Sequence, residues 1–342
     1  MANATIRDVA RAADVSVASV SRVLNGLNNV RPALREKVEA AAAQLGYVPH
    51  AGARSLSLAR SNAIGVLLPD LHGEFFSELL RGMDREASAR GLQLLLSNMH
   101  ADPARAVEAL HTMRGRVDGM VVMAPHIDPD RLAGHMPGGV PAILVNCAPH
   151  HLPRPELRID NVLGARMMVE HLVAAGRRRI LHLAGPVGNI DAEERVEGYR
   201  AAMRDAGLEP CVERGTFLEE SGVALAERLI RERSGIDAVF AANDMMAIGV
   251  LMTLRRAGVA VPDDIALAGF DDVPLARLIS PALTTLRIDI ARLGERAVIR
   301  LINLIAGGED RNIEHRAPVL VVRETTISRE NPEHRVARGM TA

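Results

Sequence analysis

The sequence is poor in the residue types that build several common functional sites. Its 342 residues contain no tryptophan, five phenylalanines, two tyrosines and two cysteines. Cys147 and Cys211 stand far apart, so they offer neither a disulfide framework nor the spacing of a metal or redox site. The twelve histidines are scattered without a zinc-binding spacing. We therefore expect no metal and no cofactor.

Long apolar runs and enzyme signatures are also missing. No stretch approaches the roughly 18 apolar residues of a membrane span, and the first seven residues lack the apolar core of an export signal. No nucleophile-elbow, Walker or dinucleotide-binding motif occurs. These absences favour a cytoplasmic protein that is neither membrane-bound nor an enzyme. A sugar-converting enzyme on an α/β fold remains a second possibility.

The most informative stretch that is present spans residues 5–26, which predict two short helices joined by a tight turn. Thr5 and Asp8 have the spacing of a capping box, and Ser16 is placed to cap the second helix. Small side chains with one arginine on an exposed helix face suit the major groove of DNA. The residues expected to face outward from the second helix are Val17, Ala18, Ser19, Ser21, Arg22 and Asn25.

Charge is distributed unevenly along the chain. Residues 1–60 hold eight cations and four anions, a net charge of +4, whereas the whole chain carries −1. A basic head on a mildly acidic body is what attraction to phosphates requires. The alternative is a plain three-helix bundle with a solvated, charged surface.

These residues resemble the DNA-binding head of the lactose/galactose-repressor (LacI/GalR) family of bacterial transcriptional regulators, and the similarity continues through the chain. The matching residues are Thr5, Asp8-Val9-Ala10, Val15-Ser16, Val20-Ser21-Arg22-Val23-Leu24-Asn25, Arg35-Glu36-Lys37-Val38, Leu45-Gly46-Tyr47-Val48-Pro49 and Leu56. The resemblance implies that the second helix enters the major groove. Val17, Ala18 and Arg22 then occupy the base-reading positions, with Arg22 suited to a bidentate contact with guanine.

Residues 50–61 join the head to the rest of the chain. Their composition alone predicts a flexible tether, since so short a helix is not stable in water. The resemblance instead implies a hinge helix that forms on DNA beside its twin from a second subunit, with Leu56 entering the minor groove. It also implies contacts to double-stranded, pseudo-palindromic operator DNA by a homodimer. The further DNA-contacting residues are Arg31, Tyr47, His50 and Ala53.

From residue 63 onward, short apolar runs alternate with amphipathic helical stretches, which predicts doubly wound parallel sheets. The resemblance implies an α/β periplasmic-binding-protein-like (type I) body of two lobes behind the all-α helix-turn-helix head. The runs expected to form buried strands are Ile64–Leu68, Leu94–Leu96, Gly119–Met123, Ala142–Val145, Ile180–Leu183, Ala238–Ala241 and Ile265–Ala268. The expected domains are a head (1–49), a hinge (50–61), a body (62–328, with one lobe at about 62–159 and 289–316 and the other at about 160–288 and 317–328) and a tail (329–342).

Ligands of doubly wound sheets bind outside the carboxyl ends of the strands. This rule selects polar residues that directly follow the apolar runs, such as Asp70, Asn243 and Asp271, although each could equally be a helix cap. The resemblance implies that Asp160, Arg195, Asn243 and Asp271 hydrogen-bond a small effector and that Phe217 stacks on it. Asp70 and Phe75 are further candidates, whereas Phe76 is expected in the core. Ile288 and Ile290 stand where some members carry polar or aromatic cleft residues.

Carboxylates accept hydrogen bonds from hydroxyl groups, and Arg and Asn side chains donate them. This combination predicts a sugar effector, with a nucleoside or purine as the alternative. The sequence therefore predicts a DNA-binding transcriptional regulator, most consistent with a repressor of carbohydrate-use genes.

Overall fold

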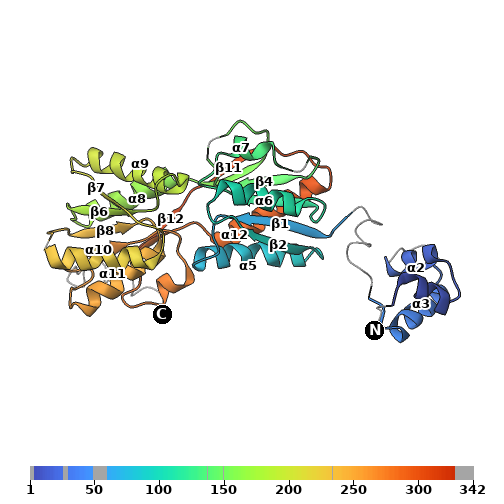
Figure 1. The fold of residues 1–342 in the computed structure, drawn as a ribbon. Helices are drawn as coiled ribbons and strands as arrows, with labels where there is room; N and C mark the ends of the chain where they lie inside the picture. The colour runs from blue at the N-terminus through green and yellow to red at the C-terminus, as the bar shows by residue number, and fades with distance from the viewer. Residues whose placement is uncertain are drawn as a thin grey trace, which may run out of the picture. The chain divides into compact units, whose positions relative to one another are not determined.

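A computed structural model of the chain describes residues 4–25, 30–48, 60–136, 138–148, 150–232 and 234–327. The chain divides into two compact units. The smaller one comprises Met1–Ala63 with Gly115–Asp118, and the larger one comprises Ile64–Arg114 with Gly119–Ala342. The first is built around a helical head and the second alternates strands and helices (Figure 1). Each is considered separately.

The head contains α1 (Ile6–Ala12), α2 (Val17–Leu24) and α3 (Pro32–Gln44). Both predicted helix starts are confirmed. Thr5 and Asp8 form a capping box, in which the Thr5 backbone N–H donates to Asp8 Oδ2 at 3.0 Å. Ser16 Oγ accepts from the Ser19 backbone N–H at 3.1 Å, which caps α2. The three helices share a small buried core of Val9, Ala10, Ala13, Val20, Val23, Val38, Ala41 and Ala42.

The body contains two lobes. The first lobe has a six-stranded sheet in the order β11-β5-β4-β3-β1-β2. The strands of this sheet are β1 (Ala63–Leu68), β2 (Gln93–Asn98), β3 (Gly119–Met123), β4 (Ala142–Val145), β5 (Glu156–Ile159) and β11 (Ile313–Arg316). The helices of this lobe are α5 (Glu74–Ser88), α6 (Pro103–Met113), α7 (Pro129–Ala133) and α12 (Ile290–Ile305).

The second lobe has a four-stranded parallel sheet in the order β7-β6-β8-β9 and an antiparallel pair, β10-β12. Its strands are β6 (Ile180–Ala184), β7 (Cys211–Arg214), β8 (Ala238–Ala241), β9 (Ala266–Ala268), β10 (Thr285–Arg287) and β12 (Val319–Val321). Its helices are α8 (Asn161–Ala174), α9 (Ile190–Asp205), α10 (Glu219–Glu232), α11 (Asp244–Arg256) and the short 3-10 helix η1 (Pro274–Arg277).

Three segments connect the lobes. Strand β5 lies in the first sheet, and the helix that follows it, α8, packs against α9 of the second lobe. Strand β10 pairs with β12, and the next helix, α12, packs against α5 of the first lobe. Strand β11 then joins the first sheet, and the chain crosses for the third time to reach β12 in the second lobe. Two of these connections therefore run directly from the β10-β12 pair.

All seven predicted runs form strands, but one prediction of burial is wrong. Strand β2 lies at the edge of the first sheet, and Leu95 and Leu96 are 37% and 47% exposed. An edge strand has a neighbour on one side only, which a local apolar run cannot reveal. The short polar strands β5, β7 and β11 escaped prediction because their sequences lack a continuous apolar run.

Helices α5 and α12 approach so closely that their backbones touch. A Cβ atom added to Gly82 would lie 1.8 Å from the Ala291 carbonyl oxygen. One added to Gly294 would lie 2.2 Å from the Leu79 carbonyl oxygen. The helix pair therefore depends on the absence of a side chain at both crossing points.

This packing predicts that Gly82→Ala destabilises the body. Overpacking of a tight interface costs about 1–3 kcal/mol, and each kcal/mol lowers Tm by about 2–4 °C in a domain of this size. Gly134→Ala is the matched control, because a Cβ there would meet no atom within 4 Å. Thermal unfolding of the two variants should separate them, and equal Tm values would contradict the proposed backbone contact.

Candidate functional site

The exposed face of α2 is the candidate DNA-reading surface of the head. Val17 is 41% exposed, and Ala18 and Arg22 are also exposed. Ser19, Ser21 and Asn25 are half-buried. The Ser16 and Ser19 hydroxyls lie 2.9 Å apart, and Asn25 Nδ2 donates to Ser21 Oγ at 3.2 Å. The face thus presents small side chains around one projecting guanidinium.

The remaining predicted DNA-contacting residues have different surroundings. Thr5 is exposed at the start of α1, and Tyr47 is half-buried against the head core. Arg31 is exposed at the N-cap of α3, where no side chain supplies a capping hydrogen bond. His50, Ala53 and Leu56, and with them the expected hinge helix, lie outside the described residues.

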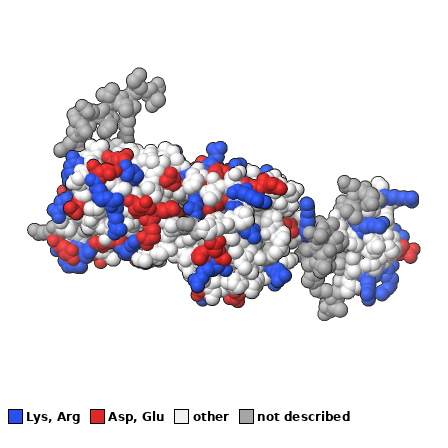
Figure 2. All heavy atoms as spheres, turned by 90° about the horizontal axis from the view of Figure 1, so that it is seen from above, with Lys and Arg blue, Asp and Glu red and all other residues white. Residues whose placement is uncertain are grey.

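Lys and Arg side chains predominate over Asp and Glu on the visible face of the head, whereas both signs are mixed over the body (Figure 2). The described ion pairs within the head are Arg11–Asp8 and Arg35–Glu39. Arg22 belongs to neither pair, so its guanidinium is available to an external partner.

The second candidate site is a cavity of about 420 Å³ between the two lobes. Its walls come from segments that follow the carboxyl ends of strands in both sheets, where ligands of doubly wound sheets bind. The lining residues that follow first-lobe strands are Pro69, Asp70, His72, Gly73, Phe75, Phe76, His100, Ala101, Met123, Pro125 and His126. Those of the second lobe are Pro186, Asn189, Asp191, Arg195, Thr216, Phe217, Leu218, Asn243, Met245, Asp271 and Val273.

Asp271 and Arg195 meet at the second-lobe wall of this cavity. Their side chains are 6% and 5% exposed, and Asp271 Oδ1 lies 3.9 Å from Arg195 Nη2. No described residue donates a hydrogen bond to that oxygen. Burial raises the pKa of the Asp271 carboxyl to about 7, although the nearby Arg195 acts in the opposite direction. A buried acceptor without a donor is suited to a ligand that brings one.

Arg195 is held rigidly by the protein itself. Its Nε donates to Asn161 Oδ1 at 2.9 Å, and its Nη1 donates to the Ala242 carbonyl oxygen. The guanidinium carbon lies 3.8 Å from the centre of the Phe270 ring, which favours a cation–π interaction. The remaining nitrogen, Nη2, is the one that lies 3.9 Å from Asp271 Oδ1.

Phe217 supplies an aromatic surface to the cavity. Its φ angle of 70° is unusual for a bulky residue, and Asn243 Nδ2 donates to its carbonyl oxygen at 2.8 Å. Asn243 Oδ1 also caps α11 by accepting from the Met246 N–H. A Cβ on Gly185 would lie 2.3 Å from the Phe217 ring, so the ring lies directly on that glycine.

The structure brings together most of the predicted effector residues. Asp70, Phe75, Arg195, Phe217, Asn243 and Asp271 all line the cavity. Asp160 is not among the lining residues, and its Oδ1 accepts from the Leu163 N–H as the cap of α8. Phe76, expected in the core, packs edge-on against Phe75 and also lines the cavity.

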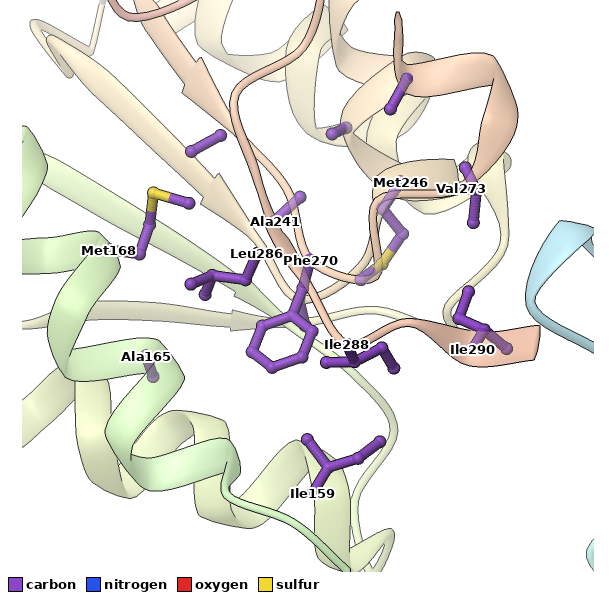
Figure 3. Close-up of a cluster of buried hydrophobic side chains, with 14 of the residues drawn as sticks. Ile159, Ala165, Met168, Ala241, Met246, Phe270, Val273, Leu286, Ile288 and Ile290 are labelled. Carbon is purple, nitrogen blue, oxygen red and sulfur yellow. The ribbon is translucent and has the colours of Figure 1, made fainter. Parts of the chain in front are cut away.

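Ile288 and Ile290 are buried in the core and do not line the cavity. They are 5% and 4% exposed and belong to the apolar cluster around Phe270 and Val273 (Figure 3).

Sequence reasoning missed several lining residues, among them Asn189 and Asp191. Asn189 caps α9, and Asp191 Oδ1 accepts from Asn161 Nδ2 at 2.9 Å. Burial raises the pKa of the Asp191 carboxyl. Both residues come after β6, but a loop that begins at Gly185 separates them from the end of that strand. The strand-end rule considers only the polar residue directly after a strand, so it does not select them.

Contacts between described residues join the lobes around the cavity. The Ile190 N–H donates to the Pro125 carbonyl oxygen at 3.0 Å, and His126 Nε2 lies 3.4 Å from Asn189 Nδ2. The Leu275 N–H donates to Glu74 Oε2 at 3.0 Å, and His72 Nε2 lies 3.5 Å from Glu219 Oε2. These contacts hold the two walls together.

Within the described ranges, no three His, Cys, Asp or Glu side chains are grouped as a metal ion would require. No described helix is both long enough and apolar enough to cross a membrane.

Two protein families match this chain. Residues 5–50 match the family of bacterial regulatory proteins called the lacI family, and residues 169–326 match a periplasmic binding protein-like domain. The ribose operon repressor of Escherichia coli strain K12 is 38% identical over 307 residues, which cover 88% of this chain and 93% of that protein.

Solved structures also resemble the fold, and two of them illustrate the similarity. A crystal structure of the lac repressor dimer bound to operator and the anti-inducer ONPF has a TM-score of 0.85 at 30% identity, covering 96% of this chain and all of that one. A complex of the transcriptional regulator CelR with cellobiose has a TM-score of 0.69 at 31% identity, covering 94% and 99%.

The buried Asp271 carboxyl predicts a pH-dependent stability. Because its pKa is raised in the folded state, the folded body binds more protons than the unfolded chain between about pH 3.8 and 7. Stability therefore falls as pH rises through this window, and the deficit is complete above it.

Asp271→Asn should consequently raise Tm by several degrees at pH 8 and by less at pH 5. Thermal unfolding at the two pH values measures this, with Asp160→Asn as control because Asn also caps helices. A Tm gain equal at both pH values would show that the Asp271 charge is not the cause.

Proposed function

This chain belongs to the lacI family of bacterial regulatory proteins and is a DNA-binding transcriptional regulator, and we propose that an uncharged sugar in the cavity controls its affinity for operator DNA. Its role is then repression of carbohydrate-use genes. The observation that carries the proposal is the buried Asp271 acceptor beside Arg195 and the Phe217 ring in one cavity.

The head reads DNA through α2. A helix with small exposed side chains fits the major groove, and the guanidinium of Arg22 suits the paired acceptors of guanine. Val17 and Ala18 offer apolar contact to a thymine methyl group. Ser16, Ser19, Ser21, Asn25, Thr5, Arg31 and Tyr47 complete the contact surface that we propose, together with His50, Ala53 and Leu56.

Two heads are needed to read a pseudo-palindromic operator, so the acting form is a homodimer. The related lac repressor was solved as a dimer bound to operator, which supports this assignment. A protein that reads chromosomal DNA works where that DNA lies, so we place it in the cytoplasm. The domain division is head 1–49, hinge 50–61, body 62–328 and tail 329–342.

The cavity is suited to a ligand with hydroxyl groups on a ring that has an apolar face. Asp271 and Asp191 accept from hydroxyls, Arg195 Nη2 donates to them, and the Phe217 ring stacks on C–H groups. The similar ribose operon repressor and the CelR–cellobiose complex support a sugar. D-ribose is the first candidate.

The charges of the cavity disfavour a phosphorylated sugar. Three carboxylates line it, those of Asp70, Asp191 and Asp271, whereas Arg195 is the one Lys or Arg side chain in the lining as described. That guanidinium already donates to protein acceptors. A phosphate would therefore meet three carboxylates and one guanidinium that already donates twice to the protein, and desolvating it would cost several kcal/mol.

Control of DNA binding follows from differential affinity. A ligand that touches both walls favours the conformation in which the lobes are close. It shifts the equilibrium between two conformations of the body only if it binds one of them more tightly than the other. We assign the cavity a binding role without catalysis, because the similar proteins named above are regulators.

The proposal is tested by binding of the full chain to operator DNA that it has itself selected from a random-sequence pool. D-ribose, D-galactose, cellobiose, adenosine and D-ribose 5-phosphate are added in turn. We expect one uncharged sugar to change the affinity and the phosphate ester to have no effect. A response to the phosphate ester or to adenosine alone would refute the uncharged-sugar assignment. Asp160→Asn should respond like the unmodified protein.

Arg22→Ala should weaken binding to the selected operator far more than to unrelated DNA. Loss of a bidentate base contact costs about 1–3 kcal/mol, which is roughly 5- to 150-fold in Kd. Arg11→Ala is the control, because it removes an exposed charge of α1 paired with Asp8 and should affect both DNAs equally. If Arg22→Ala weakens binding to both DNAs equally, Arg22 contacts phosphates and not a base.

A further inference from the structure

The loop that carries Asp271 has a strained backbone. Asp271 and Asp272 have φ angles of 112° and 56°, both in the region that favours glycine. Such a backbone conformation is unfavourable for a residue with a side chain and persists only when its surroundings hold it in place. The interactions around this loop therefore decide where the Asp271 carboxyl lies.

The Asp272 carboxylate is bound by two arginines, and we call Asp272, Arg287 and Arg323 the Asp272 clamp. Arg287 Nε donates to Asp272 Oδ2 at 2.7 Å, and Arg323 Nη2 donates to Asp272 Oδ1 at 2.5 Å. The Asp272 side chain is 8% exposed. Charge-assisted hydrogen bonds of this kind are the strong ones in proteins.

The neighbouring backbone is also held on both sides of Asp272. The Asp271 N–H donates to the Leu286 carbonyl oxygen at 2.9 Å. The Val273 N–H donates to Asp244 Oδ2 at 2.9 Å, and Thr285 Oγ1 donates to Asp244 Oδ1 at 2.5 Å. The side chain of Phe270, just before the loop, is fully buried in the cluster of Figure 3.

The clamp comes from the segments that connect the lobes. Arg287 ends β10, after which the chain passes to α12 of the first lobe. Arg323 follows β12, which the chain reaches from β11 of the first lobe. Arg323 is itself anchored, because its Nη1 donates to the Leu283 carbonyl oxygen at 2.8 Å. The two arginines thus link the loop to both connections.

We propose that Asp272 is a positioning residue for effector binding: clamped by Arg287 and Arg323, it holds the Asp271 carboxyl in the cavity wall and ties that carboxyl to the segments joining the lobes. Asp272 itself does not line the cavity. It acts through Asp271, whose Oδ1 is buried and accepts no hydrogen bond from a described residue.

Thermal unfolding of the ligand-free protein at pH 8 and pH 5 tests the clamp directly. We expect the Tm gain of Asp271→Asn at pH 8 to fall to less than about a third in an Asp272→Asn background, because the released carboxylate reaches water. An Arg323→Ala background, which removes one of the arginines that bind Asp272, should reduce the Tm gain in the same way. The charged groups that face Asp271, which are Arg195 and Asp191 on α9 and Asp244 on α11, are unchanged in all these variants.

Asp310→Asn is the matched control background. Asp310 is also bound by a guanidinium, with Arg300 Nε and Nη2 donating to its two oxygens at 2.7 and 2.8 Å, but it does not line the cavity. The gain from Asp271→Asn should persist in full there. An undiminished gain in the Asp272→Asn background as well would overturn the proposal.

A second measurement concerns the ligand and rests on the proposed function. By calorimetry with D-ribose, or with whichever sugar of the panel acts, Asp272→Asn should weaken binding by about tenfold alone and by less than about twofold in the Asp271→Asn background. Equal weakening in both backgrounds would show that Asp272 does not act through Asp271. If no sugar binds the unmodified protein, the proposed function fails, while the unfolding measurement still decides the clamp.

Discussion

The arrangement of the cavity depends on keeping the Asp271 carboxyl buried beside Arg195 without a hydrogen bond to one of its oxygens. A carboxylate in this position costs the folded protein free energy, which is reflected in its raised pKa. Arg195 does not relieve the cost fully, because its other donors are committed to Asn161 and Ala242. The sugar that we propose as effector would supply the missing donor through a hydroxyl group, so the free-energy cost falls on a residue that we assign to binding.

The same wall also links ligand binding to lobe geometry. The Asp271 loop is held by Arg287 at the end of β10 and by Arg323 just after β12; the chain leaves β10 for the first lobe and reaches β12 from it. Across the cavity, the contact of Glu74 with the Leu275 N–H reaches the helical turn that follows this loop. A ligand that binds Asp271 therefore contacts an element tied to both lobes, which is the physical requirement for a two-state response.

Much of the head and part of the cavity could be predicted from local sequence. The caps at Thr5 and Ser16 follow from side chains that satisfy nearby backbone N–H groups. Asp70, Asn243 and Asp271 follow strand ends, as the general rule for such sheets requires. The family resemblance also selected Asp160, which caps α8 in the structure and is not among the residues that line the cavity.

The sequence by itself determined the apolar strands, the starts of the head helices and the place where positive charge gathers, because these depend on neighbours within a few residues. Only the tertiary structure decided that Asp271 meets Arg195, that Asp272 meets Arg323 and that the leucines of β2 stay exposed at a sheet edge. Each of these depends on residues distant in the chain, whose approach is set by sheet order and lobe crossings that no local pattern encodes.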